Sequence, residues 1–150
     1  MRTPRGADLQ IGRVTVDDLH AIALLHAHFW GEVSDVVAMA QTLARLEGDP
    51  NHILLAARVD GVCVGTATGV VCHGLYGGFD SYLVIEDVVV DPSHRRAGVG
   101  TGLLGELERV ASERSCKQMI LLTESDRKDA AALYESVGFE ARWTGFKKKL

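Results

Sequence analysis

Residues 85–104 read IEDVVVDPSHRRAGVGTGLL and constrain the fold more than any other stretch of the chain. An apolar run ends at Asp91-Pro92, where proline stops a strand because it cannot donate to the ladder. After the glycines, apolar residues recur at helical spacing, which predicts a helix beginning near Gly98. The first N–H groups of a helix lack partners within it and carry the positive end of its dipole. Strand, glycine-rich turn and helix in this order therefore predict a phosphate site.

Two arginines sharpen this prediction. Arg95 and Arg96 stand just before the helix, where an exposed cation costs about 0.3–1 kcal/mol unless an anion lies beside it. Three glycines at alternate positions from Gly98 onward permit unusual dihedrals and let a ligand approach the main chain. The alternative is a pair of solvated arginines answered by Asp91 or another surface acid. The glycines favour the phosphate interpretation.

Two common glycine-rich nucleotide motifs fit poorly. A dinucleotide fingerprint requires Gly-x-Gly-x-x-Gly directly after the first strand, whereas this turn comes late and Leu103 stands at the third glycine position. A P-loop requires Gly-Lys followed by Ser or Thr, and the sequence contains no such run. The phosphate-bearing ligand is therefore expected to be of another kind.

The turn follows the pattern Arg/Gln-x-x-Gly-x-Gly/Ala, here Arg95 to Gly100, after the Ile-Glu-Asp-Val-Val-Val-Asp-Pro strand. A second block, AAALYESVGF over residues 130–139, follows at the expected distance. The two blocks resemble the acyl-CoA-binding motif and the Ala-x-x-Leu/Phe-Tyr-Glu-x-x-Gly-Phe/Tyr run of the GNAT N-acetyltransferase superfamily. This resemblance is specific from about Ile85 to Leu150, and before that it is only topological.

The resemblance implies acetyl-CoA as co-substrate and no metal. Backbone amides from Arg96 to Thr101 would hold the CoA pyrophosphate, and Val88 and Val90 would pair with the pantetheine arm like an added strand. In that family the central strand diverges from the next one, the arm meets the acceptor in the gap, and an N–H near Val88 stabilises the oxyanion. The predicted cofactor-binding residues are Val88, Val89, Val90, Arg95, Arg96, Ala97, Gly98, Val99, Gly100, Thr101 and Arg127.

Arg127 departs from the superfamily pattern. An asparagine often stands three residues before the first alanine of the second block and bonds to the pantetheine arm, but this chain has Arg127 there. The sequence leaves three roles open for Arg127, namely contact with the cofactor phosphates, contact with the acceptor, or solvation.

Glu86 is the predicted general base. An alkyl ammonium has a pKa of about 10.4, so an amine acceptor must lose a proton, directly or through a water, before it attacks. A carboxylate in a buried apolar strand needs a reason to be there, and many GNAT members carry an acid at this position. The alternative is that Glu86 or Asp87 pairs with an arginine or caps a backbone group. Strand alternation predicts that these two carboxylates point to opposite faces.

Tyr134 is the predicted general acid. In the superfamily a tyrosine of the Leu-Tyr-Glu block commonly lies beside the CoA sulfur, where its hydroxyl would protonate the leaving thiolate. The alternative is a core aromatic residue whose hydroxyl is hydrogen-bonded elsewhere.

Two segments, residues 26–32 and 73–79, are expected to line the acceptor pocket, because aromatic residues on glycine-hinged loops suit a small molecule. The predicted substrate residues are Phe29, Trp30 and Tyr76. The alternative for Phe29 and Trp30 is simple closure of the core. His26 and His28 stand two apart on a helix and do not face each other, so no metal site is expected.

Composition favours a single domain over residues 1–150, with 47% apolar and 24% charged residues. The net charge of −4 argues against a nucleic-acid partner. No apolar run approaches the roughly 20 residues of a membrane span, and no signal-peptide pattern opens the chain. Three cysteines lack metal-ligand spacing and resemble reduced thiols, which predicts a cytoplasmic protein; they are Cys63, Cys72 and Cys116.

The order of elements predicts a three-layer α/β fold of GNAT type, with a mixed central β-sheet flanked by helices. Thr15-x-x-Asp18 has the form of a capping box, and Asp60-Gly61 that of a hairpin turn. The expected strands cover residues 9–14, 52–59, 62–72, 81–90, 118–123 and 140–148. The expected helices cover residues 15–29 and 35–47, a stretch from about 98, and residues 127–136.

These features predict an acetyl-CoA-dependent N-acetyltransferase that acetylates a primary amine of a small molecule by direct attack in a ternary complex. No cysteine stands at a motif position that suggests a covalent intermediate. The tail FKKKL, residues 146–150, resembles the ending of aminoalkylphosphonate-type members. The alternatives are a protein or peptide N-acetyltransferase and a non-catalytic acyl-CoA sensor, which would need neither Glu86 nor Tyr134. Homodimerisation is common in this fold and is not readable from the sequence.

Overall fold

The computed structural model describes residues 6, 8–78 and 80–150. Its strands are β1 (Leu9–Arg13), β2 (His52–Val59), β3 (Val62–His73), β4 (Ser81–Val90) and β5 (Cys116–Leu121). Its helices are α1 (Leu19–Trp30), α2 (Val36–Leu46), α3 (Val99–Glu113) and α4 (Lys128–Ser136), with short 3-10 turns η1 (Val16–Asp18) and η2 (Pro92–His94).

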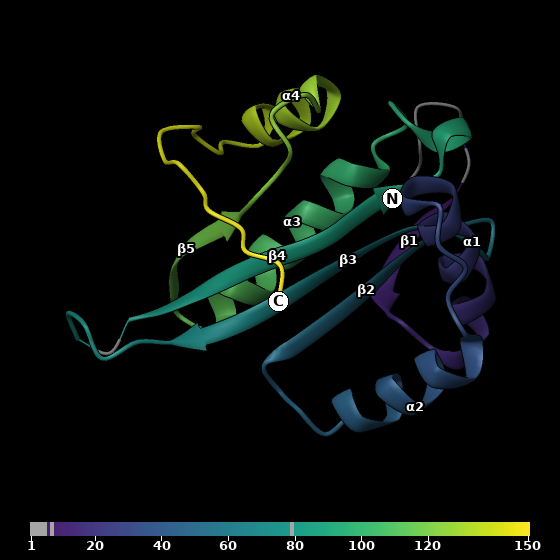
Figure 1. The fold of residues 1–150 in the computed structure, drawn as a ribbon, viewed down its shortest axis with the longest axis horizontal. Coiled ribbons are helices and arrows are strands. Elements are labelled where there is room, and N and C mark those ends of the chain that lie inside the picture. The colour runs from purple at the N-terminus through teal and green to yellow at the C-terminus, as the bar shows by residue number, and fades with distance from the viewer. Residues whose placement is uncertain (1–5, 7, 79) are drawn as a thin grey trace.

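The strands form one sheet in the order β1-β2-β3-β4-β5. The pairs from β1 to β4 are antiparallel, whereas β5 runs parallel to β4 after the α3 crossover. Helices α1 and α2 cover one face and α3 covers the other (Figure 1). The expected mixed sheet in a three-layer α/β fold is therefore confirmed.

Two apolar clusters join these layers. The larger one packs Leu103 and Leu107 of α3 against Leu83 and Ile85 of β4. The smaller one packs α1 against the opposite face, through residues that include Ile22, Leu25 and Val89.

Local hydrogen bonds and turn conformations explain where η1 and α2 begin and where the β2–β3 hairpin turns. Asp18 completes the predicted capping box, because its carboxylate accepts from both the N–H and the hydroxyl of Thr15. Asp35 caps α2 by accepting from Val37 N and Ala38 N. Asp60 and Gly61 both have positive φ, at 49° and 83°, as a tight turn with a right-handed strand twist requires.

The predicted last strand over residues 140–148 is wrong. This segment has no strand pairing and is exposed throughout, and Trp143 and Phe146 keep 80% and 91% of their surface accessible. Ordering a strand costs conformational entropy, and side chains that bury so little apolar area do not offset it. The tail still passes close to the end of β5, since a Cβ built on Gly145 would clash with the side chain of Leu122.

Among the helices of the described residues, none is both long and apolar enough to span a bilayer.

Candidate active site

Strand β4 contains a β-bulge that the sequence did not reveal. Thr68 pairs with Glu86 and Thr66 pairs with Val89, so Ala67 alone stands opposite both Asp87 and Val88. Asp87 absorbs the extra residue with φ at +52°, a region that aspartate and asparagine tolerate better than most residues.

The bulge breaks the alternation of side chains along β4. Pairing places Glu86 on the same face as Thr68, and Asp87 lines a cavity on that face together with Thr66 and Thr68. The predicted opposite orientation of Glu86 and Asp87 is therefore wrong. The side chain of Glu86 is exposed and has no hydrogen bond or ion pair with another described residue.

Strands β4 and β5 separate at the bulge. Their last pair is Ile85 with Leu121, whereas β4 continues to Val90 in register with β3. Residues 86–90 of β4 therefore face a gap on the β5 side, the divergence that the family resemblance implied. Chain beyond β5 turns away toward α4 (Figure 1).

The turn between β4 and α3 contains two residues with positive φ and leads into a helix without a side-chain cap. Arg96 and Gly98 have φ of +56° and +83°, and Gly98 caps α3 without any side-chain hydrogen bond to its first amides. Ala97, Val99 and Gly100 are buried, so their side chains are not offered to a ligand. Thr101 is exposed at the first turn of the helix.

Gly100 also serves the packing of the fold. A Cβ added there would lie 2.8 Å from Leu133 Cδ2, so the absence of a side chain lets α4 pack closely against the start of α3. The sequence interpretation of this glycine, close approach of a ligand, missed this second requirement.

One of the two arginines of the turn has an acidic partner, but this partner is not Asp91. Arg95 Nη1 lies 4.0 Å from Asp129 Oδ2 of α4, with both side chains well exposed. Asp91 instead accepts hydrogen bonds from the N–H and hydroxyl of Ser93, and those bonds hold the pKa of its carboxyl below the usual value. Arg96 is exposed.

Tyr134 is half-buried on α4 and meets the Phe139 ring edge-on, with centroids 6.0 Å apart. Burial raises the pKa of its hydroxyl, and Asp129 raises it further while Arg127 opposes both. The phenol therefore stays protonated at neutral pH, as a general acid must.

Arg127 is not simply solvated. Its guanidinium carbon lies 4.2 Å from the centroid of the Phe29 ring, a cation–π contact, and its Nε lies 3.6 Å from Asp129 Oδ1. The structure thus joins a predicted cofactor residue to a predicted substrate residue. Trp30, beside them, packs edge-on against Phe29 and His26 and keeps 51% of its surface accessible.

The model of the acetyltransferase (GNAT) family matches residues 14–139. The chain belongs to the GNAT acetyltransferase family. It is 31% identical to the N-acetyltransferase YhfO of Bacillus subtilis, over 92% of this chain and 93% of that protein.

Two further GNAT proteins are informative. Aminoglycoside N(6')-acetyltransferase type 1 of Salmonella typhimurium is 30% identical over 56% of this chain, and the match covers 59% of that protein's length. The solved aminoglycoside N-acetyltransferase AAC(6')-Iy, in complex with CoA, shares the fold with a TM-score of 0.78 at 22% identity, over 98% of this chain and 99% of that one.

The second predicted acceptor segment, which begins at residue 73, lies far from the point where β4 and β5 separate. Tyr76 is 91% exposed in the loop that precedes Ser81, at the opposite end of β4 from Val88 (Figure 1). Phe79, in the same predicted loop, lies outside the described residues. The structure brings Phe29 and Arg127 together but does not bring Tyr76 to them.

A cavity of 380 Å³ lies between α1, α2 and the sheet, and we call it the α1–α2 cavity. Aliphatic side chains make most of its wall. Its polar lining consists of His26, Asp35, Thr42, Thr66, Thr68 and Asp87. The sequence placed His26 in a predicted acceptor segment and Asp87 directly after the predicted base, but neither position indicated that the two side chains would line one cavity.

His26 is the unusual group in this lining. Burial lowers the pKa of its imidazole, while the nearby Asp87 carboxylate acts in the opposite direction. Its Nε2 is buried and has no hydrogen-bond partner among the described residues. An unpaired buried polar atom costs free energy, so its presence calls for a ligand or a water.

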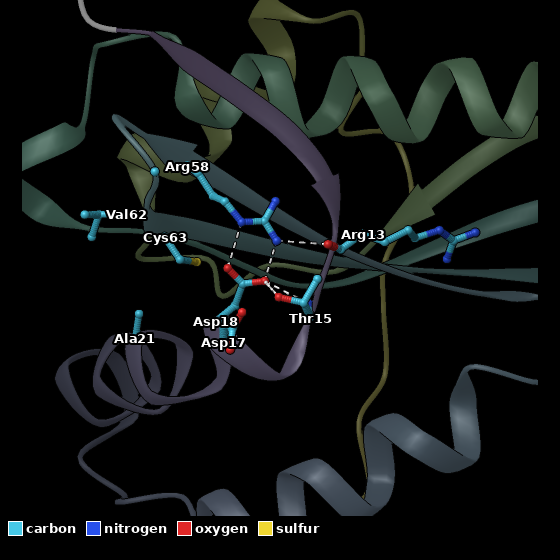
Figure 2. Close-up of a pocket in the computed structure, with 9 residues that line it drawn as sticks. Arg13, Thr15, Asp17, Asp18, Ala21, Arg58, Val62 and Cys63 are labelled. Carbon is cyan, nitrogen blue, oxygen red and sulfur yellow. Dashed lines mark hydrogen bonds and ion pairs between the residues drawn. The ribbon is translucent and has the colours of Figure 1, made fainter.

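A second, larger cavity of 490 Å³ lies at the start of α1, where Figure 2 shows Arg58 of β2 reaching Asp18. Arg58 Nε donates to Asp18 Oδ1 at 2.8 Å, and its Nη2 donates to Asp18 Oδ2 and to the carbonyl of Arg13. Burial alone would raise the pKa of Asp18, but the hydrogen bonds from Arg58 and Thr15 outweigh it and hold it low. These groups satisfy one another, so this cavity has the features of a structural junction.

No group of three or more His, Cys, Asp or Glu side chains in the described ranges is arranged to hold a metal ion. The three cysteines are unpaired, with Cys63 buried and Cys72 and Cys116 half-buried.

Proposed function

We propose that this GNAT chain is an acetyl-CoA-dependent N-acetyltransferase that acetylates the primary amine of a small molecule by direct attack in a ternary complex. The observation that carries the proposal is the end of β4–β5 pairing at Ile85, close to an α3 N-terminus whose first amides have no side-chain cap. The names of relatives that acetylate aminoglycosides support transfer to a small amine.

The residues present fit acetyl-CoA. A pyrophosphate would accept hydrogen bonds from the amides that begin at Gly98, with Arg95 and Arg96 beside it. An extended pantetheine arm would pair with the free edge of β4 through Val88 and Val90. Bound there, acetyl-CoA supplies an activated thioester carbonyl.

The chain's own groups would then handle the protons and the developing charge. Glu86 accepts the proton of the incoming ammonium, directly or through a water, and the neutral amine attacks the carbonyl carbon. A backbone N–H at Val88 stabilises the oxyanion. When the oxyanion collapses, the C–S bond breaks, the new N–C bond persists, and Tyr134 gives its proton to the leaving thiolate. The nitrogen, positively charged after the attack, releases its second proton to solvent, from which Tyr134 is protonated again.

Two alternatives are outcomes of the test below. A protein or peptide N-acetyltransferase would use the same donor site with an extended acceptor. A non-catalytic acyl-CoA sensor would keep the turn and need neither Glu86 nor Tyr134. A cytoplasmic location and independence from metal stay predictions, and homodimerisation stays open.

The direct experiment measures thiol release from acetyl-CoA against a panel of small amines, aminoglycosides, aminoalkylphosphonates and short peptides. Glu86→Gln and Tyr134→Phe are expected to lower kcat by about 10²–10⁴-fold, the usual contribution of general acid–base catalysis. Matched controls are Glu108→Gln on the exposed side of α3 and Tyr82→Phe at the far end of β4.

The donor site is tested separately by acetyl-CoA titration of the same variants. Retained binding with lost turnover supports the assigned roles. Turnover on peptides alone would favour the protein N-acetyltransferase, and tight acetyl-CoA binding without turnover on any acceptor would favour the sensor.

A further inference from the structure

The wall of the α1–α2 cavity is amphipathic. One part is aliphatic, with Leu19 and Ile22 from α1, Met39 and Leu43 from α2 and Leu54 from β2. The described residues that line it include no lysine and no arginine. At 380 Å³ the volume falls in the range of about 300–1,000 Å³ that small-ligand pockets occupy.

Half of the six polar residues of the lining already have hydrogen-bond partners, and Thr42 is one of them, because its hydroxyl accepts from Arg45 Nη2. Asp35 accepts from the first amides of α2, and the Thr66 hydroxyl donates to the carbonyl of Leu55. Asp87 is different, because its side chain has no hydrogen bond or ion pair with any described residue. His26 Nε2 is likewise buried without a partner. The lining groups without a partner among the described residues are therefore the Asp87 carboxylate, the His26 Nε2 nitrogen and the Thr68 hydroxyl, and the first two lie close enough to interact electrostatically.

This polar end adjoins the proposed reacting centre. Asp87 is the bulged residue of β4, directly before Val88, and it stands two positions after Ile85, where pairing with β5 ends. A molecule in the α1–α2 cavity with its amine at Asp87 would thus present that amine beside the gap assigned to the thioester.

We propose that the α1–α2 cavity binds the body of the acceptor, and that the acceptor is a monoamine with an apolar alkyl or arylalkyl group. This inference rests on the proposed function and names its substrate class. The Asp87 carboxylate binds the ammonium group, and the aliphatic wall takes the apolar group.

His26 completes the polar end as an uncharged hydrogen-bond partner of the amine. Burial lowers the pKa of its imidazole, and a neutral ring offers one acceptor nitrogen. The titratable groups that face it across the cavity are Asp87 from β4 and Asp35 from α2, while β2 and β3 contribute only Leu54, Thr66 and Thr68. The amine therefore meets carboxylates and an uncharged ring, with no competing cation.

A polar amino sugar suits this wall poorly. Its hydroxyl groups would lose water and face aliphatic side chains without hydrogen-bond partners. A phosphate group on the acceptor would be repelled by Asp35 and Asp87, and no lysine or arginine of the lining would neutralise its charge. The inferred acceptor class therefore differs from that of the aminoglycoside-acetylating relative.

The test compares kcat/KM for phenethylamine and hexylamine with that for kanamycin and glucosamine 6-phosphate, using the full chain and acetyl-CoA. We expect the apolar amines to be favoured by at least about tenfold, the discrimination that one or two buried methylenes supply. Amine binding without acetyl-CoA is measured by calorimetry in parallel.

Two variants locate the effect. Ala38→Trp adds bulk at the α1–α2 cavity, whereas Val37→Trp adds it one residue away on the exposed side of α2. Ala38→Trp should raise KM for phenethylamine by about tenfold or more, with Val37→Trp close to the parent. Asp87→Asn keeps a residue type that tolerates positive φ and should raise KM for every amine.

The outcomes separate this inference from the proposed function. Efficient acetylation of kanamycin with poor use of apolar amines would overturn the inference and leave the enzyme standing. Equal KM values for phenethylamine in Ala38→Trp and Val37→Trp would also overturn it. No turnover on any amine would instead contradict the proposed function.

Discussion

The two faces of the sheet differ in how closely the helices pack against them. On the α3 face, Leu103 and Leu107 are fully buried, and a Cβ on Gly69 would lie 2.8 Å from Leu107 Cδ2. On the opposite face, α1 and α2 leave a cavity of 380 Å³ against β2, β3 and β4. Close packing therefore holds α3, whose first turn is the proposed donor site, while the other face leaves room for the proposed acceptor.

We expect the largest effect from a cavity created in the tightly packed α3 face. Leu107→Ala removes a side chain with no exposed surface and should lower the free energy of unfolding by about 2–5 kcal/mol. Leu46→Ala, which borders the α1–α2 cavity and is only half-buried, should cost less than half as much. Urea unfolding measures both. Equal losses would remove the contrast between the two faces.

A second change tests the closest contact of the donor turn. Gly100→Ala places a methyl group 2.8 Å from Leu133 Cδ2 and should cost about 1–3 kcal/mol through overpacking, with a higher Kd for acetyl-CoA. Gly105→Ala on the same helix meets no atom within 4 Å and should stabilise by about 0.5–1 kcal/mol. If the two substitutions behaved alike, packing of α4 on α3 would not constrain the turn.

A third prediction concerns the contact that links the two faces near the gap. The Arg127–Phe29 pair should give a coupling energy of about 0.5–1 kcal/mol in a double-mutant cycle with Arg127→Ala and Phe29→Leu. Thermal or urea unfolding of the four proteins supplies the cycle. Strict additivity would show that the stacking contributes nothing to stability.

The smallest effect is pH-dependent and belongs to the looser face. The pKa of His26 is lower in the folded chain than its ordinary 6.5, so the unfolded chain takes up this proton first as pH falls. Stability should therefore decrease as pH falls from about 6.5 toward the folded pKa, and level off below it. In His26→Gln the unfolding midpoint should change less across this window. An unchanged pH profile would show that His26 does not titrate differently on folding.

The sequence predicted features that depend on neighbouring residues. The turn between β4 and α3, which we propose binds phosphate, follows from Asp91-Pro92, the glycines and the start of an amphipathic helix, all within a dozen positions. The capping box of Thr15 and Asp18 and the Asp60-Gly61 turn are local in the same sense, and the structure confirms them.

Features that depend on strand register were not predictable. The bulge at Asp87 arises because Ala67 faces two residues of β4, which no run of single-strand residues reveals. The α1–α2 cavity depends on the position of α2 relative to Thr66 and Thr68 of β3. The predicted last strand does not form because Trp143 and Phe146 bury too little apolar surface to hold it on the sheet. In each case the outcome depends on tertiary packing, which the local sequence pattern does not determine.

Hydrogen exchange of backbone amides, with and without acetyl-CoA, is the most direct test that acetyl-CoA binds between the free edge of β4 and the start of α3. We expect slowed exchange in peptides that cover residues 86–90 and 96–102, with β1 and β2 unchanged, because the free edge of β4 and the start of α3 would acquire partners. Binding of acetyl-CoA that protects other segments and leaves these two unchanged would contradict it.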